Sequence, residues 1–544
     1  MKNNILTIDE ISLDEIKSYY ECLSEISDNE LFEGLLANGL FADKIPNFLS
    51  SEIFFNFVNN KDINFEQKSF LYIKYENMRN INIPRLLAIP NPFAYYKQCK
   101  ILKENWDNLR EHFKEKTKDD KHKISRIHIR KIFDSKKIFE MNYKTHKKDG
   151  NPEQKIFIGK KYLVKADISN CFPSIYTHSI AWALIGKEEA KKNKNKNNEW
   201  YNQIDKSTTW LNNNETHGLL IGPHTSNVIS EIILVCVDNE LSKKYEYIRN
   251  IDDYSCYVET KEKADQFLID LSKELKKFDL SLNHKKTEIV ELPIPYNNEW
   301  VRKLKLFKLE HYLESNTNIK KINYKDVCLL LDTGVELMKN NKDNAAILNY
   351  AIKILLREKM SLNAEKYFID TIHHLLLIYP YLVILLEKIF DNINMDIKKT
   401  SQISDDIFSL GIRTNNYELM SYAIYFSLKY NFKLKHKNLI KEANKQEDCI
   451  FMLLCYLYDK KNLSKYKDKF KKYVNIAKKF IVDQNNIKVL NDEFWLFAYE
   501  VLKMEKDKSL QKCKDWKQLQ DNDISFINFE KINLNYKNNT KNKE

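Results

Sequence analysis

The stretch "YIRNIDDYSCYV", residues Tyr247–Val258, places two adjacent carboxylates between two short apolar-rich runs. Tyr, Ile and Val are common in β-strands, so the runs predict a strand, a tight turn and a second strand, with Asp252 and Asp253 at the tip. Taken alone, an Asp pair is more typical of a turn than of an active site. Carboxylates held this close repel each other unless a cation lies between them, and oxygen ligands suit hard ions such as Mg²⁺.

A third carboxylate, Asp167, ends an apolar run in "VKADISNCF". The run predicts a strand that ends at Asp167, followed by a loop containing Pro173 and then a helix. Strand-end carboxylates brought together in one sheet can bind two divalent ions, which bridge a triphosphate and stabilise the leaving pyrophosphate. Asp167, Asp252 and Asp253 are therefore candidate metal ligands and catalytic residues for nucleotidyl transfer, with Mg²⁺ or Mn²⁺ as the cofactor.

The length and the charge limit the possible classes of protein. A chain of 544 residues exceeds the size at which one core keeps growing, so two or three domains are expected. The net charge is +12, and residues 110–165 hold 18 Lys and Arg against 8 Asp and Glu. Such a basic block is either a solvated face or a surface that neutralises phosphates, and the composition favours neither.

Cysteine usage and hydropathy indicate the compartment. The nine cysteines include no CxxC pair and no zinc-site spacing, which favours a reducing compartment without structural zinc. The N-terminus lacks the apolar core of a signal peptide. The longest apolar stretch is interrupted by Pro380 and is too short to span a bilayer. A soluble cytoplasmic protein with no membrane contact is expected.

The order of patterns along the chain predicts an α+β core followed by a helical region. Residues 160–291 read as strand, helix, loop and helix, hairpin, helix and strand, with one helix expected over 225–244. From about residue 318 onward, apolar stripes at helical spacing follow one another, as in helices that stack into solenoids. The last residues are rich in Asn and Lys and are expected to be disordered.

Four ordered motifs resemble those of reverse transcriptases. Asp167 resembles motif A, "HGLLIGP" resembles the QGxxxSP loop of motif B, and "IDD" resembles the YxDD of motif C. "LSLNHKKTEI" is similar to the LxLNxxKT element that follows, with Asn283, Lys286 and Thr287 at its polar positions. A lone Asp pair is a weak signal, whereas four motifs in the right order within about 130 residues are a strong one.

The details resemble the abortive-infection reverse transcriptases of bacteria, of the AbiK and Abi-P2 type. The resemblance rests on "DISNCFPSIYTHSIAWALIGK", "ETHGLLIGPHTSN", "RNIDDY" and "LPIPYNNEW". It implies a polymerase core of the right-hand type, with fingers and palm, joined to HEAT-like helical repeats. It also implies phage defence by template-independent DNA synthesis from dNTPs, primed by a protein hydroxyl. The implied partners are a covalently linked single-stranded DNA product, further copies in a homo-oligomer and a phage-encoded trigger.

The resemblance also assigns roles to single residues. Asp167 and Asp252 would ligate both metals, with Asp253 in support. Phe172 matches the aromatic residue that excludes a ribose 2′-hydroxyl, although an ordinary core Phe is the alternative. The remaining nucleotide-binding candidates are Gly218, Gly222, Lys286, Arg126 and Arg130. A turn at the start of a helix would also explain the two glycines, and Lys286 could simply be a solvated side chain.

The sequence departs from the family pattern at three positions. Asn250 replaces the Tyr of YxDD, His217 replaces the Gln of motif B, and Gly222 replaces its Ser. The Tyr and the Gln normally help to seat the primer end and the templated nucleotide, so these changes disfavour templated copying. The alternatives are a templated reverse transcriptase of the retron or intron kind, and an inert polymerase fold that serves as a binding scaffold.

These patterns divide the chain into four expected parts. A mainly helical N-terminal region covers 1–80, and fingers and palm cover 81–310. Helical repeats cover 311–520, and a disordered tail covers 521–544. The priming hydroxyl cannot be chosen from the sequence, because most of the 31 tyrosines must be packing residues.

Overall fold

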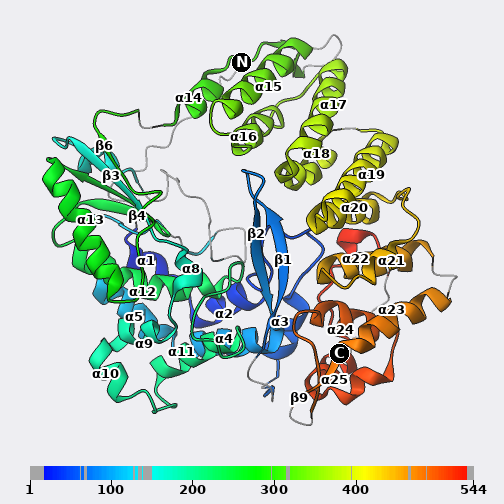
Figure 1. The fold of residues 1–544 in the computed structure, drawn as a ribbon, viewed down its shortest axis with the longest axis horizontal. Helices are drawn as coiled ribbons and strands as arrows, with labels where there is room; N and C mark the ends of the chain where they lie inside the picture. Colours follow the sequence, from blue (N-terminus) through cyan, green and yellow to red (C-terminus); the bar gives the residue numbers. More distant parts are fainter. Residues whose placement is uncertain are drawn as a thin grey trace. The chain divides into compact units, whose positions relative to one another are not determined.

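The fold of this chain, a computed structural model, is described for residues 17–61, 63–65, 70–126, 129–132, 138, 150–295, 297–313, 319–393, 395–463, 467–484 and 487–535. The chain divides into two compact units (Figure 1). The first unit comprises 1–42, 51–72 and 88–294, and the second comprises 43–50, 73–87 and 295–544. Two short segments from the first hundred residues therefore belong to the C-terminal unit.

The first unit holds a four-stranded antiparallel sheet with the strand order β4-β5-β3-β6. Its strands are β3 (Tyr162–Asp167), β4 (Tyr247–Asn250), β5 (Asp253–Val258) and β6 (Glu288–Glu291). Its helices are α1 (Tyr19–Ser24), α2 (Asp28–Leu36), α3 (Glu52–Asn59), α4 (Pro92–Glu104), α5 (Trp106–Thr117), α7 (Glu153–Ile156), α8 (Cys171–Ser174), α9 (His178–Ile185), α10 (Lys187–Lys192), α11 (Trp200–Trp210), α12 (Thr225–Leu241) and α13 (Lys261–Lys276). The predicted strands, the hairpin and the helices that precede and follow it are confirmed, whereas α10 and α11, which lie between α9 and α12, were not predicted.

The two faces of this sheet differ in burial. Cross-strand partners share a face, and the register pairs Tyr254 with Arg249 and with Ala166, all of them buried. Helices α12 and α13 cover this face: Tyr247 donates a hydrogen bond to Asp238 of α12, and its ring lies 5.9 Å from that of Phe267 in α13. Asp167 pairs with Asp253 on the opposite face. The sheet therefore presents its carboxylates on the face that α12 and α13 leave open.

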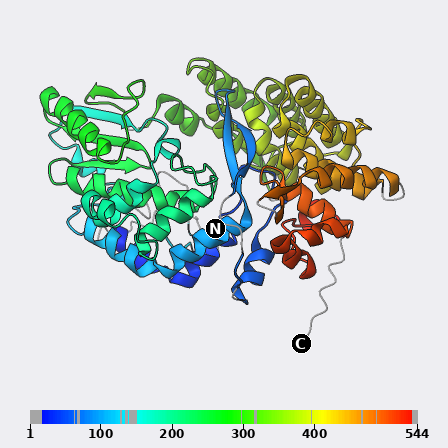
Figure 2. The same ribbon diagram turned by 60° about the horizontal axis from the view of Figure 1, so that its bottom comes forward.

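The second unit is mostly helical (Figure 2). Its helices are α14 (Glu299–Leu306), α15 (Tyr324–Lys339), α16 (Ala346–Leu355), α17 (Leu362–Ile378), η2 (Pro380–Leu385), α18 (Leu386–Asn392), α19 (Ile397–Thr414), α20 (Tyr417–Tyr430), α21 (Leu439–Ala443), α22 (Cys449–Asn462), α23 (Lys467–Lys479), α24 (Trp495–Met504), η3 (Lys508–Lys512), α25 (Lys514–Asp521) and η4 (Glu530–Ile532). Successive helices pack side by side, α15 on α16 and α17, α19 on α20, and α22 on α20 and α24. The predicted helical C-terminal region is confirmed, and its assignment to HEAT-like repeats stays a prediction.

Three hairpins also belong largely or wholly to the second unit. They pair β1 (Tyr72–Met78) with β2 (Pro84–Pro90), β7 (His311–Leu313) with β8 (Lys320–Ile322), and β9 (Ile481–Gln484) with β10 (Ile487–Leu490). Glu418 of α20 fixes the first hairpin, because it accepts hydrogen bonds from the Asn77 side chain at 2.5 Å and from the Met78 backbone at 2.7 Å. Burial raises the pKa of Glu418 to about 7. A long-range contact therefore assigns this hairpin to the helical unit.

The expected disordered tail is wrong for residues 521–535. Ile524, Phe526 and Ile527 are buried, and the Tyr499 hydroxyl donates to the Ile524 carbonyl at 2.6 Å. Apolar residues spaced among polar ones are enough to anchor this stretch, whereas 536–544 lie outside the described residues. The other expected domain boundaries stay predictions. Of the helices in the described ranges, none has the length and apolar character needed to cross a membrane.

Candidate active site

The carboxylates of Asp167, Asp252 and Asp253 converge at one end of the sheet. Each offers an oxygen, and the three oxygens lie within 4.8 Å of one another. Asp167 is the last residue of β3 and Asp253 the first of β5, and the ladder places them opposite each other. Within the described part of the chain, no other group of three or more acidic, His or Cys side chains is this close. The sequence prediction that Asp167 joins the Asp pair is confirmed.

The exposure of the three carboxylates suits a site that is open on one side. Asp167 is buried, Asp252 is half-buried and Asp253 is exposed. Partial desolvation, together with the charges of Asp252 and Asp167, raises the pKa of Asp253 to about 7. Ionisation of all three groups is therefore unfavourable in the bare site, and a bound divalent cation would relieve the repulsion.

Two residues of the segment that follows α13, Asn283 and Lys286, form hydrogen bonds with Asp167. The Asn283 side chain donates to Asp167 Oδ1 at 2.9 Å, and its backbone N–H donates to the Asp167 carbonyl at 2.7 Å. Lys286 Nζ donates to Asp167 Oδ2 at 2.7 Å, and this hydrogen bond raises the pKa of the lysine. An ion bound at Oδ2 would compete with the ammonium for the same oxygen. The structure thus brings Lys286 to the carboxylates, and its contact with a triphosphate stays a prediction.

The hairpin turn that carries Asp252 has a strained backbone. A two-residue turn, Ile251 and Asp252, connects Asn250 to its ladder partner Asp253. Ile251 adopts φ +58°, a conformation that is unfavourable for a β-branched residue. Arg249 Nη1 donates to the Ile251 carbonyl at 2.9 Å, and the Ile168 N–H donates to the Asp252 carbonyl at 3.1 Å. These two contacts fix the turn and therefore the position of Asp252.

Sequence reasoning missed the ion cluster beneath this turn. Arg249 is fully buried and donates to Glu231 and Asp238 of α12, at 3.1 Å and 2.5 Å for its Nη2 atom. The Tyr247 hydroxyl donates to Asp238 at 2.9 Å. Burial raises the pKa of Asp238, and the Arg249 charge opposes this shift. The available signal was the pair Glu231 and Asp238, which flank the apolar run 232–237 and lie seven positions apart, a spacing that places both on one face of a helix.

The two expected glycines shape the loop beside α8. Gly218 has φ +92° and Gly222 φ +132°, and a Cβ at Gly222 would lie 2.9 Å from the Ala88 carbonyl oxygen. The Leu219 N–H donates to the carbonyl of Phe172 at 2.8 Å. The loop thus packs along α8, where Phe172 is half-buried. Close backbone packing explains both glycines, and nucleotide contact by them and by Phe172 stays a prediction.

The two expected arginines are placed inside the unit. Arg126 is buried, and its guanidinium lies 3.2 Å from the Glu153 carboxylate. Arg130 is buried as well, and its backbone N–H donates to the Ile138 carbonyl at 2.9 Å. The structure therefore gives Arg126 an internal partner, and the expected triphosphate contact stays a prediction for both residues.

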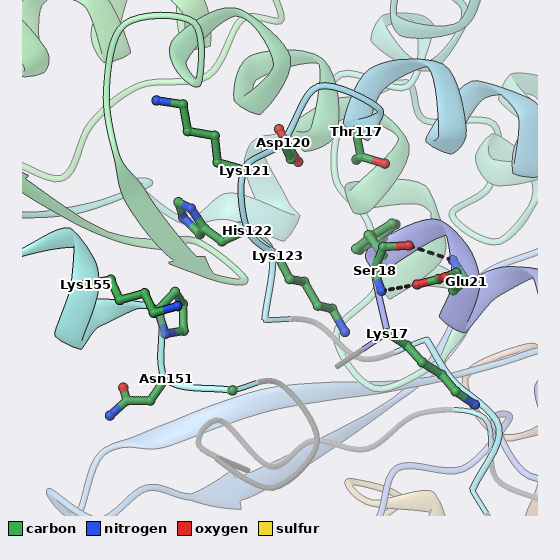
Figure 3. Close-up of a pocket in the computed structure, with 13 residues that line it drawn as sticks. Lys17, Ser18, Glu21, Thr117, Asp120, Lys121, His122, Lys123, Asn151 and Lys155 are labelled. Atoms are coloured by element: carbon green, nitrogen blue, oxygen red, sulfur yellow. Dashed lines mark hydrogen bonds between the residues drawn. The ribbon is translucent and has the colours of Figure 1, made fainter. Parts of the chain in front are cut away.

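Part of the basic block forms a separate cavity of about 340 Å³ (Figure 3). His122 Nε2 lies 2.8 Å from the Tyr247 carbonyl, at the opposite end of β4 from Asp252. Basic side chains in the lining are Lys17, Lys121, His122, Lys123 and Lys155. Lys17 pairs with Glu25, and Lys121 lies 3.8 Å from Glu246. This portion of the block lies away from the carboxylates, and its binding of phosphate stays a prediction.

Mg²⁺ is expected to stabilise the protein through the three carboxylates. At pH 8, saturating Mg²⁺ should raise the melting temperature by roughly 5 °C or more, because the ion binds only the folded site. Asp252→Asn should abolish the rise, whereas Asp265→Asn, which removes an exposed carboxylate on α13, should retain it. Differential scanning fluorimetry with and without EDTA measures both. An equal rise in the Asp252→Asn protein would place the ion elsewhere.

Removal of the buried guanidinium is expected to destabilise the first unit. Arg249→Met leaves the Glu231 and Asp238 carboxylates without their cation, which costs about 3 to 5 kcal/mol and lowers the melting temperature by roughly 6 to 20 °C. Lys243→Met removes an exposed partner of Glu240 and should change stability by less than about 1 kcal/mol. Circular dichroism melts compare the two variants. Equal stability would show that the cluster does not hold the hairpin.

Comparison with known proteins agrees with this geometry. Residues 96–322 match the family described as reverse transcriptase (RNA-dependent DNA polymerase). No curated protein matches the chain. A solved structure described as "Structure of apo telomerase from Candida Tropicalis" is similar at 11% identity over 69% of this chain and 71% of that chain, with a TM-score of 0.29, too low to carry an argument. Residues 96–322 are therefore a reverse transcriptase family polymerase domain, with Asp167, Asp252 and Asp253 as its candidate catalytic triad.

Proposed function

We propose that this chain is a phage-defence DNA polymerase that adds deoxynucleotides to a hydroxyl of the protein itself, without a template. The convergence of Asp167, Asp252 and Asp253 on the open face of the sheet carries the polymerase part of the proposal. A set of oxygen ligands at the edge of a sheet, in a domain of the reverse transcriptase family, suits Mg²⁺-dependent nucleotidyl transfer.

The proposed reaction is an in-line substitution at the α-phosphorus of a dNTP. A bond forms between the attacking hydroxyl oxygen and phosphorus, the hydroxyl proton passes to solvent water, and the bond to pyrophosphate breaks. Divalent ions held by Asp167 and Asp252 would polarise the phosphate and stabilise the leaving group. Lys286 Nζ lies 2.7 Å from Asp167 Oδ2. In this proposal its ammonium donates a proton to the leaving pyrophosphate or stabilises its negative charge.

Two replacements in the family motifs support synthesis without a template. Asn250, in place of a Tyr, is the ladder partner of Asp253 beside the turn. His217, in place of a Gln, is exposed, and the centroid of its ring lies 4.9 Å from that of Tyr176. An imidazole therefore stands where the family has a carboxamide. The side chains that seat a primer end and a templated nucleotide in the family are therefore different in this chain, whereas the three carboxylates are present.

The defence role and the partners rest on the sequence resemblance to abortive-infection enzymes. In this proposal the product is single-stranded DNA attached to the protein, further copies of the chain assemble into a homo-oligomer, and a phage component triggers activity. The helical second unit agrees with the two-part architecture of those enzymes. A templated polymerase and an inert scaffold are the alternatives that experiment must separate.

Incubation with Mg²⁺ and labelled dNTPs, with no template or primer, is expected to label the protein. The label should remain after denaturation, because the first nucleotide forms a phosphoester with a side-chain hydroxyl. Denaturing gel electrophoresis detects it, and Asp252→Asn should remove it while Asp265→Asn retains it.

Other outcomes separate the alternatives. Extension only when RNA template and primer are added would indicate templated copying. Absence of any synthesis, combined with unaltered phage resistance in the Asp252→Asn variant, would indicate a scaffold.

Phe172 is expected to exclude ribonucleotides. Phe172→Val removes the aromatic ring that would face a 2′-hydroxyl, so incorporation of rNTPs relative to dNTPs should rise roughly tenfold or more. Phe172→Tyr keeps the ring and should keep the selectivity. The ratio is measured by competition between labelled dCTP and CTP. Unchanged selectivity in Phe172→Val would assign the residue to core packing alone.

A further inference from the structure

A second site in the first unit lies at the cavity formed by α9, α10 and α11. Its volume is about 490 Å³, within the range of small-molecule sites. The cavity borders the motif-B-like loop, because Tyr176 in its lining pairs with His217. Its lining residues all belong to the stretch 176–216, which the structure describes without a gap. None of them is among the three carboxylates.

One wall of the cavity is aromatic. Tyr176 and Trp182 meet edge to face with 5.6 Å between ring centroids, and His178 lies 4.9 Å from Tyr176. The wall is supported from behind, because Trp182 packs against the buried Ala181, Ala190 and Tyr201. The ammonium of Lys187 covers one face of the Trp182 ring, 3.8 Å from its centroid, so a planar base would contact the Tyr176 ring and the remaining face of Trp182.

A buried acceptor also lines the cavity. Asp205 is 7% exposed, and its Oδ2 atom accepts a hydrogen bond from His178 Nδ1 at 2.6 Å. Its Oδ1 atom has no hydrogen-bond partner among the described residues. A buried carboxylate oxygen without a hydrogen-bond donor is energetically unfavourable. Oδ1 is enclosed, so an N–H donor of a ligand in the cavity would reach it after a shift of the Asp205 side chain toward the cavity.

Two lysines lie at the rim of the cavity. Lys194 and Lys206 are exposed lining residues, and neither has a carboxylate partner within the described ranges. Lys206 lies 3.4 Å from the Asn197 side-chain oxygen. Asn202 fixes the loop that carries Lys194, since its amide donates to the Asn193 and Lys196 carbonyls at 2.9 Å. The hydrogen bond to Asp205 raises the pKa of His178, which favours its protonated form.

We infer that this cavity binds a nucleotide unit, with its base against Tyr176 and Trp182, an amino group on Asp205, and its phosphate at Lys194 and Lys206. An aromatic wall, a buried acceptor and basic rim residues together match a base that carries a phosphate. The unit can come from a single strand of DNA or from a free nucleotide. The inference goes beyond the proposed polymerase reaction, because it concerns a different set of residues and requires no catalysis.

The buried carboxylate predicts which bases fit. Cytosine presents an amino group that a carboxylate accepts. Thymine has a similar size, but carbonyl oxygens flank its single N–H donor, and they would repel Asp205. The cavity should therefore prefer dC over dT, and a preference of this kind distinguishes a built site from general attraction between lysines and phosphates.

Binding of labelled dC12 and dT12 by fluorescence anisotropy, in EDTA, tests the inference. The full chain carries Asp252→Asn, so that no self-made strand competes. We expect dC12 to bind at least about tenfold more tightly than dT12. Lys194→Glu with Lys206→Glu should weaken dC12 binding at least about tenfold and lower the salt slope by about 2. Lys192→Glu with Lys196→Glu, on the same segment but outside the lining, is the matched control.

Further measurements test whether the variant folds, whether Asp205 contacts the base, and whether the ligand is a strand or a free nucleotide. Asp205→Asn should erase the preference for dC, while its melting temperature reports whether the variant folds. Competition by dCMP but not dTMP would identify a free nucleotide as a sufficient ligand, whereas binding of dC12 alone would identify the strand. Three results would each overturn the inference. They are the absence of binding to dC12 and dCMP, equal affinity for dC and dT, and an equal loss of affinity in the lining pair and the control pair of variants. Because no synthesis is needed, these results stand apart from the labelling experiment on the proposed polymerase.

Discussion

The active-site hairpin depends on one buried guanidinium. Arg249 joins β4 to Glu231 and Asp238 of α12, and it also donates to the Ile251 carbonyl in the turn. A buried cation with two carboxylates is stable only while every partner is in place. The cluster therefore fixes the hairpin against its covering helix and holds a strained residue next to Asp252. The ion cluster on one face of the sheet therefore supports the strained turn that carries Asp252, a candidate metal ligand.

One face of the sheet packs against helices, and the other carries the candidate catalytic carboxylates. Strand alternation sends Arg249, Tyr254 and Ala166 toward α12 and α13, and it sends Asp253 and Asp167 to the open face. A change of register by one residue would turn the carboxylates toward α12 and α13 and turn the ion cluster toward the open face. The same alternation therefore specifies both the core of the unit and the position of the candidate catalytic triad.

The motif-B-like loop connects the candidate active site to the cavity beside α11. Its Leu219 N–H donates to Phe172, next to the site, and His217 pairs with Tyr176, which lines the cavity. Gly218 and Gly222 permit this close packing because they adopt positive φ values. A strand or nucleotide held at the cavity would thus contact the segments that also border the incoming nucleotide in our proposal.

The sequence by itself determined the hairpin, the strand ending at Asp167, the helix that begins at Thr225 and the helical C-terminal region. That helix was predicted to continue to residue 244, whereas it ends at Leu241. These features depend on periodicity and on residue type, which act locally. Only the tertiary structure decided that Arg249 pairs with Glu231 and Asp238, that the β1–β2 hairpin joins the helical unit through Glu418, and that Asp205 lines a cavity. Periodicity indicates which face of a helix or strand is buried. The residues that pack against this face come from segments distant in the sequence, and local patterns do not specify them.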